Sequence, residues 1–123
     1  MHYLQWKMPT TLYGWEQAGM HYDNTLSYAN HAGFRCGTCH EYQAFDPVLH
    51  SILNLHIRPL IAMESTLIDK EYMGLGLSEA AYEEFEKLKS ACRAVDGIFS
   101  LLWHNTRLTT EQECELYKAV ITV

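Results

Sequence analysis

The sequence lacks the features of an exported, membrane-spanning or nucleic-acid-binding protein. None of its apolar runs approaches the roughly 20 residues that cross a bilayer. Its start, MHYLQWKMPTT, has no basic region followed by an apolar one, so we expect no secretory signal. Nine Lys and Arg against 15 Asp and Glu give a net charge of −6, which argues against a nucleic-acid partner. We therefore expect a cytoplasmic protein that binds neither nucleic acid nor membrane.

Cysteine is scarce, and its four copies do not suggest a disulfide framework, because thiols stay reduced in the cytoplasm. Two of them nevertheless lie in the stretch Cys36-Gly-Thr-Cys39-His40. C-x-x-C-H is the pattern that attaches c-type haem. A zinc site is a second interpretation, with Cys36, Cys39, His40 and His31 as its candidate ligands.

The surroundings of this stretch favour neither interpretation. Covalent haem attachment normally follows export and uses a motif that begins a helix, whereas this motif lies in a glycine-rich loop. A zinc site would need a second C-x-x-C or H-x-x-H pair, and a thioredoxin-like redox pair would need a helix N-terminus. We interpret Cys36 and Cys39 as small residues that pack a tight loop, and we expect no metal ligands and no cofactor in this chain.

The length and the hydrophobic pattern predict a single domain over residues 1–123. Helical spacing and helix-boundary residues predict helices at 10–18, 65–73, 79–95 and from 111 onwards, the last opened by a Thr110-x-x-Glu113 capping box. Short apolar segments predict strands at 2–6, 20–23, 57–63 and 98–103, and residues 29–51 are interpreted as a long structured loop. This alternation is typical of parallel α/β architecture.

Polar residues follow each of the predicted strands, where parallel α/β folds carry their working side chains. These residues are Lys7, Asp23, Glu64 and the pair His104-Asn105. Four strands are about half of an eight-stranded barrel, so the chain looks like part of a larger fold.

Three stretches taken in order carry a family resemblance: HYLQW at 2–6, YDNTLSYANHAGFRCGTC at 22–39 and FSLLWHN at 99–105. Together they resemble the C-terminal half of the polysaccharide deacetylase (NodB-homology) family, in a bacterial branch with R-x-H-Y-L-R-W, Y-D-S-T-L, G-F-R-x-G-T-C and L-L-W-H-N motifs. The similarity runs from residue 2 to about 117. The chain departs from that branch at Gln5 and Asn24.

The resemblance implies a partial (β/α) barrel of the deacetylase type whose N-terminal strands are missing. An intact member binds a divalent metal, commonly zinc, through an Asp and two His of the N-terminal half. The resemblance therefore implies a truncated or split deacetylase without its metal ligands. We expect it to be inactive alone, with a carbohydrate as the substrate class and a homo-oligomer or a complementing chain as its protein partner.

The resemblance also implies roles for individual residues. His104 matches the general acid that protonates the leaving amine, Tyr3 matches a residue whose backbone N–H stabilises the oxyanion, and Asp23 matches an Asp near the site. Candidate substrate-binding residues are Trp103, Trp6 and Arg35. The alternatives left open are a non-catalytic carbohydrate- or partner-binding remnant, and a redox or metal protein built on CGTCH.

Overall fold

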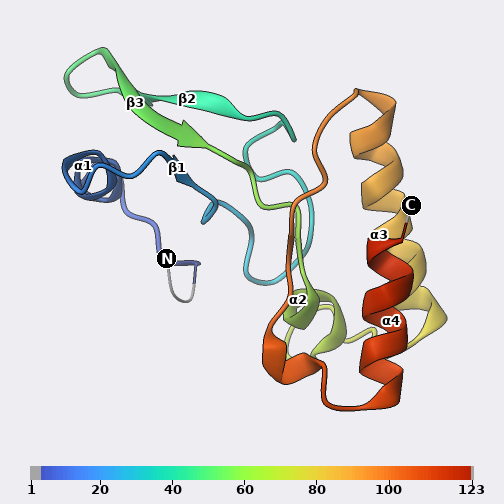
Figure 1. The fold of residues 1–123 in the computed structure, drawn as a ribbon. Helices are drawn as coiled ribbons and strands as arrows, with labels where there is room; N and C mark the ends of the chain where they lie inside the picture. The colour runs from blue at the N-terminus through green and yellow to red at the C-terminus, as the bar shows by residue number, and fades with distance from the viewer. Residues whose placement is uncertain (1–3, 123) are drawn as a thin grey trace.

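The computed structural model describes residues 4–122, which form a mixed α/β fold with two small sheets (Figure 1). The elements in chain order are α1 (Thr10–Gln17), β1 (Tyr22–Asp23), β2 (Tyr42–Asp46), β3 (Ser51–Ile57), β4 (Ala62–Met63), α2 (Glu64–Ile68), α3 (Glu79–Ala94), β5 (Leu101–Leu102), a 3₁₀ turn (Asn105–Arg107) and α4 (Glu111–Ile121). No helix among the described residues is long and apolar enough to cross a membrane.

The first sheet has the order β1-β3-β2, with β1 parallel and β2 antiparallel to β3. Its hairpin turns at Asp46, whose Oδ1 accepts from the backbone N–H of Val48 at 2.8 Å and of Leu49 at 3.0 Å. Strand β1 is too short to cover β3. The carboxylate of Glu16 in α1 takes its place and accepts from the N–H groups of Asn54 and Leu55, each at 3.1 Å.

The Asp46 turn gives the fold a predicted sensitivity to acid. Burial acts to raise the pKa of this carboxyl, but the N–H donors of Leu49 and Val48, together with Tyr13 and His50, outweigh it, and the pKa lies below its ordinary value. A lowered folded-state pKa stabilises the fold above the unfolded pKa, about 3.9, and this stabilisation is lost as pH falls through the folded value.

We therefore expect the wild type to lose stability faster than Asp46→Asn when the pH is lowered from about 5 to 3. Asn still offers an acceptor oxygen to the turn but does not titrate. Urea unfolding of both proteins at several pH values measures the difference. A gap in stability that stays constant with pH would contradict this origin of the acid sensitivity.

The second sheet pairs β4 with β5 in parallel, with Ala62 opposite Leu101 and Met63 opposite Leu102. Helices α3 and α4 pack against each other beside this sheet (Figure 1). The capping box predicted for α4 is confirmed, because Thr110 and Glu113 exchange their side-chain to backbone bonds. The helices predicted at 10–18 and 79–95 are also confirmed, as α1 and α3.

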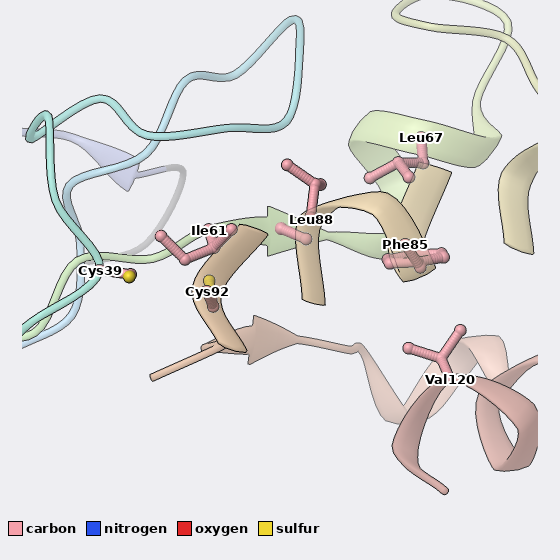
Figure 2. Close-up of a cluster of buried hydrophobic side chains, with 8 residues drawn as sticks. Cys39, Ile61, Leu67, Phe85, Leu88, Cys92 and Val120 are labelled. Atoms are coloured by element: carbon pink, nitrogen blue, oxygen red, sulfur yellow. The ribbon is translucent and has the colours of Figure 1, made fainter. Parts of the chain in front are cut away.

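The apolar interior is divided into two clusters. The first lies between the second sheet and helices α3 and α4, with Phe85 and Ile61 fully buried at its centre (Figure 2). The second lies between α1 and the first sheet, around Leu12 and Leu55. The CGTC loop joins them: Cys39 is buried in the first cluster, and Cys36 packs against the second. Figure 2 shows the sulfur atom of Cys39 in the first cluster, on the side of Cys92.

Several predicted segments differ from the structure. Residues 4–6 are not a strand, since Leu4 has a φ of 50°, and the rest of that prediction lies outside the described residues. The predicted loop at 29–51 contains all of β2. The predicted strand at 57–63 is broken near Pro59, which cannot donate a ladder bond, so β3 ends at Ile57 and β4 starts in the other sheet. The predicted strand at 98–103 shortens to two residues, because Ile98 donates to the carbonyl of Cys39 instead.

The predicted helix at 65–73 is also shorter, ending at Ile68. The described residues form two separate sheets and no closed barrel, so the partial deacetylase-type barrel stays a prediction.

Candidate acid–base site

Two of the predicted strand-end residues meet at the second sheet. Glu64 directly follows β4, and His104 is the second residue after β5. The parallel pairing brings both to the same end of the sheet. Oε1 of Glu64 lies 2.5 Å from Nδ1 of His104. Forty residues of sequence separate the two side chains, so only the sheet register makes the pair.

The two side chains differ sharply in exposure. The side chain of Glu64 is 0% exposed, whereas that of His104 is 49% exposed. Within residues 4–122, Oε2 of Glu64 is buried without a hydrogen-bond partner. Burying a carboxyl with one unpaired oxygen opposes folding, so this arrangement is costly for the fold and suggests a use in function.

The chemistry of the pair follows from its geometry. An ionised carboxylate only accepts, so when Glu64 is ionised the shared proton is on Nδ1 of the imidazole, and Nε2 is the nitrogen that can exchange a proton with another molecule. A half-exposed histidine whose Nδ1 is held by a buried carboxylate is the arrangement of a general acid or base.

Neighbouring contacts fix the segment that carries His104. Trp103 packs its ring against Phe85 and Tyr117, with centroids 5.9 and 5.1 Å apart, and its indole N–H donates to the carbonyl of Arg107 at 3.0 Å. The guanidinium of Arg107 in turn contacts Asp69 at 2.6 Å. These contacts tie the 3₁₀ turn to the residues after α2, so both sides of the Glu64–His104 pair are anchored.

The other predicted site residues lie elsewhere or serve the fold. Asp23 is buried at the end of β1 in the first sheet, where its carboxylate accepts from the N–H and hydroxyl of Thr25. Trp6 packs against the second cluster, and Arg35 donates to the carbonyl of Ser27 at 2.7 Å. Tyr3 lies outside the described residues. The roles predicted for these residues and for Trp103 stay predictions, and the contacts of Trp103 are those of a packed side chain.

The candidate ligands in and near CGTCH are also dispersed. Cys36 and Cys39 belong to different apolar clusters, and burial together with the nearby thiol of Cys39 raises the pKa of Cys92 to about 12. His31 stacks on Tyr28. Among the described residues, no three His, Cys, Asp or Glu side chains come together as a metal would require.

From the sequence, Glu64 is predicted to follow a strand, but its contact with His104 is not predicted. The strand order could have indicated this contact, because two parallel neighbouring strands bring the residues that follow them close together. Comparison of the chain with protein-family models, with curated proteins and with solved structures gives no match.

Proposed function

We propose that this chain supplies the acid–base half of a polysaccharide deacetylase-like site, acting on N- or O-acetyl groups of a glycan. The observation that carries the proposal is the Glu64–His104 pair at the carboxyl ends of two adjacent parallel strands. The resemblance of LLWHN to the family's last motif gives His104 its role, and the buried carboxylate gives the imidazole a fixed orientation.

In the proposed step, protonated His104 donates its Nε2 proton to the nitrogen of the departing sugar amine. That nitrogen belongs to the tetrahedral intermediate formed when water has added to the acetamide carbonyl. Its C–N bond breaks as the nitrogen takes the proton, which releases the free amine and acetate and leaves the imidazole neutral. Glu64 acts as a positioning residue, because it touches only the far nitrogen of the ring. Proton transfer from a positioned side chain typically contributes 10²–10⁴-fold to a rate.

A divalent metal that activates water is implied by the resemblance, but the described residues do not fit one, since they form no group of three metal-ligating side chains. We assign this chain only the proton transfer. We therefore expect purified protein to release no acetate from an acetylated chito-oligosaccharide. Acetate release at the rate of an intact deacetylase would contradict this assignment.

The proposal is tested by whether an acetylated glycan reaches His104. In an NMR titration, we expect N-acetylglucosamine tetramers to shift the ¹⁵N resonances of the His104 imidazole, while those of the exposed His40 imidazole stay unchanged. Glu64→Gln should reduce the change in the His104 chemical shifts. The glutamine amide can either accept from Nδ1–H or donate to Nδ1, so it no longer selects one tautomer of the imidazole. A His104 signal that is indifferent to every acetylated glycan tried would remove the basis of the proposal.

A second candidate function is partner binding through the β2–β3 hairpin. Strand β2 is an edge of the first sheet, and the hairpin exposes Phe45, Val48, Leu49 and Ile52 by 51% to 69%. Phe45 and Ile52 are cross-strand neighbours. An edge strand with exposed apolar side chains can pair with a further strand, here from a second copy or a complementing chain.

We expect the protein to self-associate above the 14.2 kDa of one chain as its concentration rises, and Phe45→Lys to return it to the monomer. The matched control is Val95→Lys, an apolar residue exposed by 57% after α3, which should leave the association unchanged. Light scattering measures the mass. A wild type that stays monomeric at every concentration would count against this function.

A further inference from the structure

The loop formed by residues 27–35 carries an exposed aromatic pair that neither the fold nor the acid–base site uses. Tyr28 and His31 stack with ring centroids 4.1 Å apart and an interplanar angle of 24°. Tyr28 is 37% exposed, and His31 is exposed as well. Within residues 4–122, neither ring belongs to either buried cluster.

The 27–35 loop is held in one shape by bonds at its base. Arg35 donates to the carbonyl of Ser27 at 2.7 Å and closes the loop on itself. The N–H of Gly33 donates to the carbonyl of Ile61 at 2.9 Å. Gly33 has a φ of 138°, a conformation that side-chain-bearing residues rarely adopt. A loop fixed in this way presents its exposed rings without losing much conformational entropy on binding.

A third anchor places the 27–35 loop beside the acid–base site. The hydroxyl of Thr66 donates to the carbonyl of Ala29 at 3.1 Å. Thr66 lies in α2, two residues after Glu64. The loop therefore lies at the end of β4 where the Glu64–His104 pair is located.

The loop also offers polar atoms that could hydrogen-bond to a ligand beside the aromatic pair. Oδ1 of Asn30 lies 2.9 Å from Nδ1 of His31, which fixes both side chains. In the described part of the chain, Nδ2 of Asn30 and Nε2 of His31 have no protein partner. The two stacked rings cover each other on one side, so a sugar would pack on the outer face of the pair. An exposed aromatic face next to amide and imidazole nitrogens matches a pyranose, which has an apolar C–H face and a rim of hydroxyls.

We propose that Tyr28, Asn30 and His31 form a sugar-binding platform that holds one pyranose unit of a glycan next to the unit at His104. The proposal rests on the proposed function for the second of these units, but the platform itself needs only a sugar ring. It therefore predicts two separable responses. The loop should respond to any β-1,4-linked glucose-type oligomer, whereas His104 should respond only when an acetamide is present.

The experiment titrates the full chain with N-acetylglucosamine tetramer and with cellotetraose, and follows the loop and His104 resonances separately. We expect both sugars to shift the loop signals, and the acetylated one alone to shift His104. Tyr28→Ala should weaken binding of both sugars at least tenfold, Tyr28→Phe should keep most of it, and Asn30→Ala should weaken it less. Phe45→Ala removes an exposed aromatic ring from the hairpin and serves as the matched control.

The outcomes separate the two proposals. Loop shifts without a His104 shift would support the platform and overturn the proposed function. A His104 shift with unchanged affinity in Tyr28→Ala would overturn the platform and leave the proposed function in place. Shifts at neither site would overturn both. Thermal unfolding of each variant shows whether it is folded, and Tyr28→Phe and Asn30→Ala keep the test valid if Tyr28→Ala is not.

Discussion

Replacing Gly97 with alanine is expected to lower the free energy of unfolding by about 1–3 kcal/mol. A Cβ atom at this position would lie 2.1 Å from Sγ of Cys39, a separation that no pair of nonbonded atoms tolerates. The sulfur cannot simply move, because Cys39 is buried in the first cluster and its carbonyl accepts from Ile98 at 3.2 Å. Chemical denaturation of wild type and variant measures the loss.

A double-mutant cycle isolates this clash. Cys39→Ala removes the sulfur, and the nearest atoms to the new methyl group at position 97 are then the carbonyl oxygen of Cys92 at 3.3 Å and the Cβ of residue 39 at 3.4 Å. Gly97→Ala should therefore cost less than half as much in the Cys39→Ala background. Gly14→Ala is the matched control: it has nothing within 4 Å and lies inside α1, so it should stabilise the protein by about 0.5–1 kcal/mol. Equal costs in both backgrounds would show that the sulfur is not the obstacle.

This contact also explains what the CGTC stretch does in the fold. Cys39 fits against the glycine that follows α3, while Cys36 reaches the other cluster three residues earlier. A larger residue at 39 would not fit, and a polar one would be buried without a partner. The packing interpretation made from the sequence agrees with these contacts, although no local pattern indicates that Cys39 packs against Gly97.

The helices could be predicted because their signals are local. The Thr110–Glu113 capping box and the apolar spacing of α3 are each contained in one segment. Strand β2 could not be found in this way, because at its last two residues burial runs opposite to hydrophobicity. Phe45 faces solvent, whereas Asp46 is fully buried as the acceptor of the following turn.

The candidate site was predictable in part. His104 and Glu64 each follow an apolar segment, so strand-end reasoning finds both, but only the register of β4 and β5 joins them. The 27–35 loop was beyond sequence reasoning. Its shape depends on Arg35, Gly33 and Thr66, and two of these bonds run to residues 28 and 37 positions away in the chain.

Replacing Glu64 with leucine is expected to leave the fold as stable as wild type or to stabilise it by about 1–3 kcal/mol. The carboxyl is fully buried, and among the described residues one of its oxygens has no partner while the other is hydrogen-bonded to His104. Because His104 is half exposed, water can take over the bond at Nδ1 once Glu64 is gone, and no buried charge is left behind. Leucine has a similar volume and needs no partner, so the transfer out of water becomes favourable.

The same variant should abolish the His104 response to acetylated glycans, since nothing then selects its tautomer or orientation. Leu67→Ala in the same helix is the control for damage to packing, and it should cost about 2–5 kcal/mol. If replacing Glu64 stabilises the protein and also removes the His104 response to glycans, then Glu64 is retained for function rather than for folding. If Glu64→Leu instead destabilises the protein by more than about 1 kcal/mol, the carboxyl is part of the structural core, and the acid–base site loses its positioning residue.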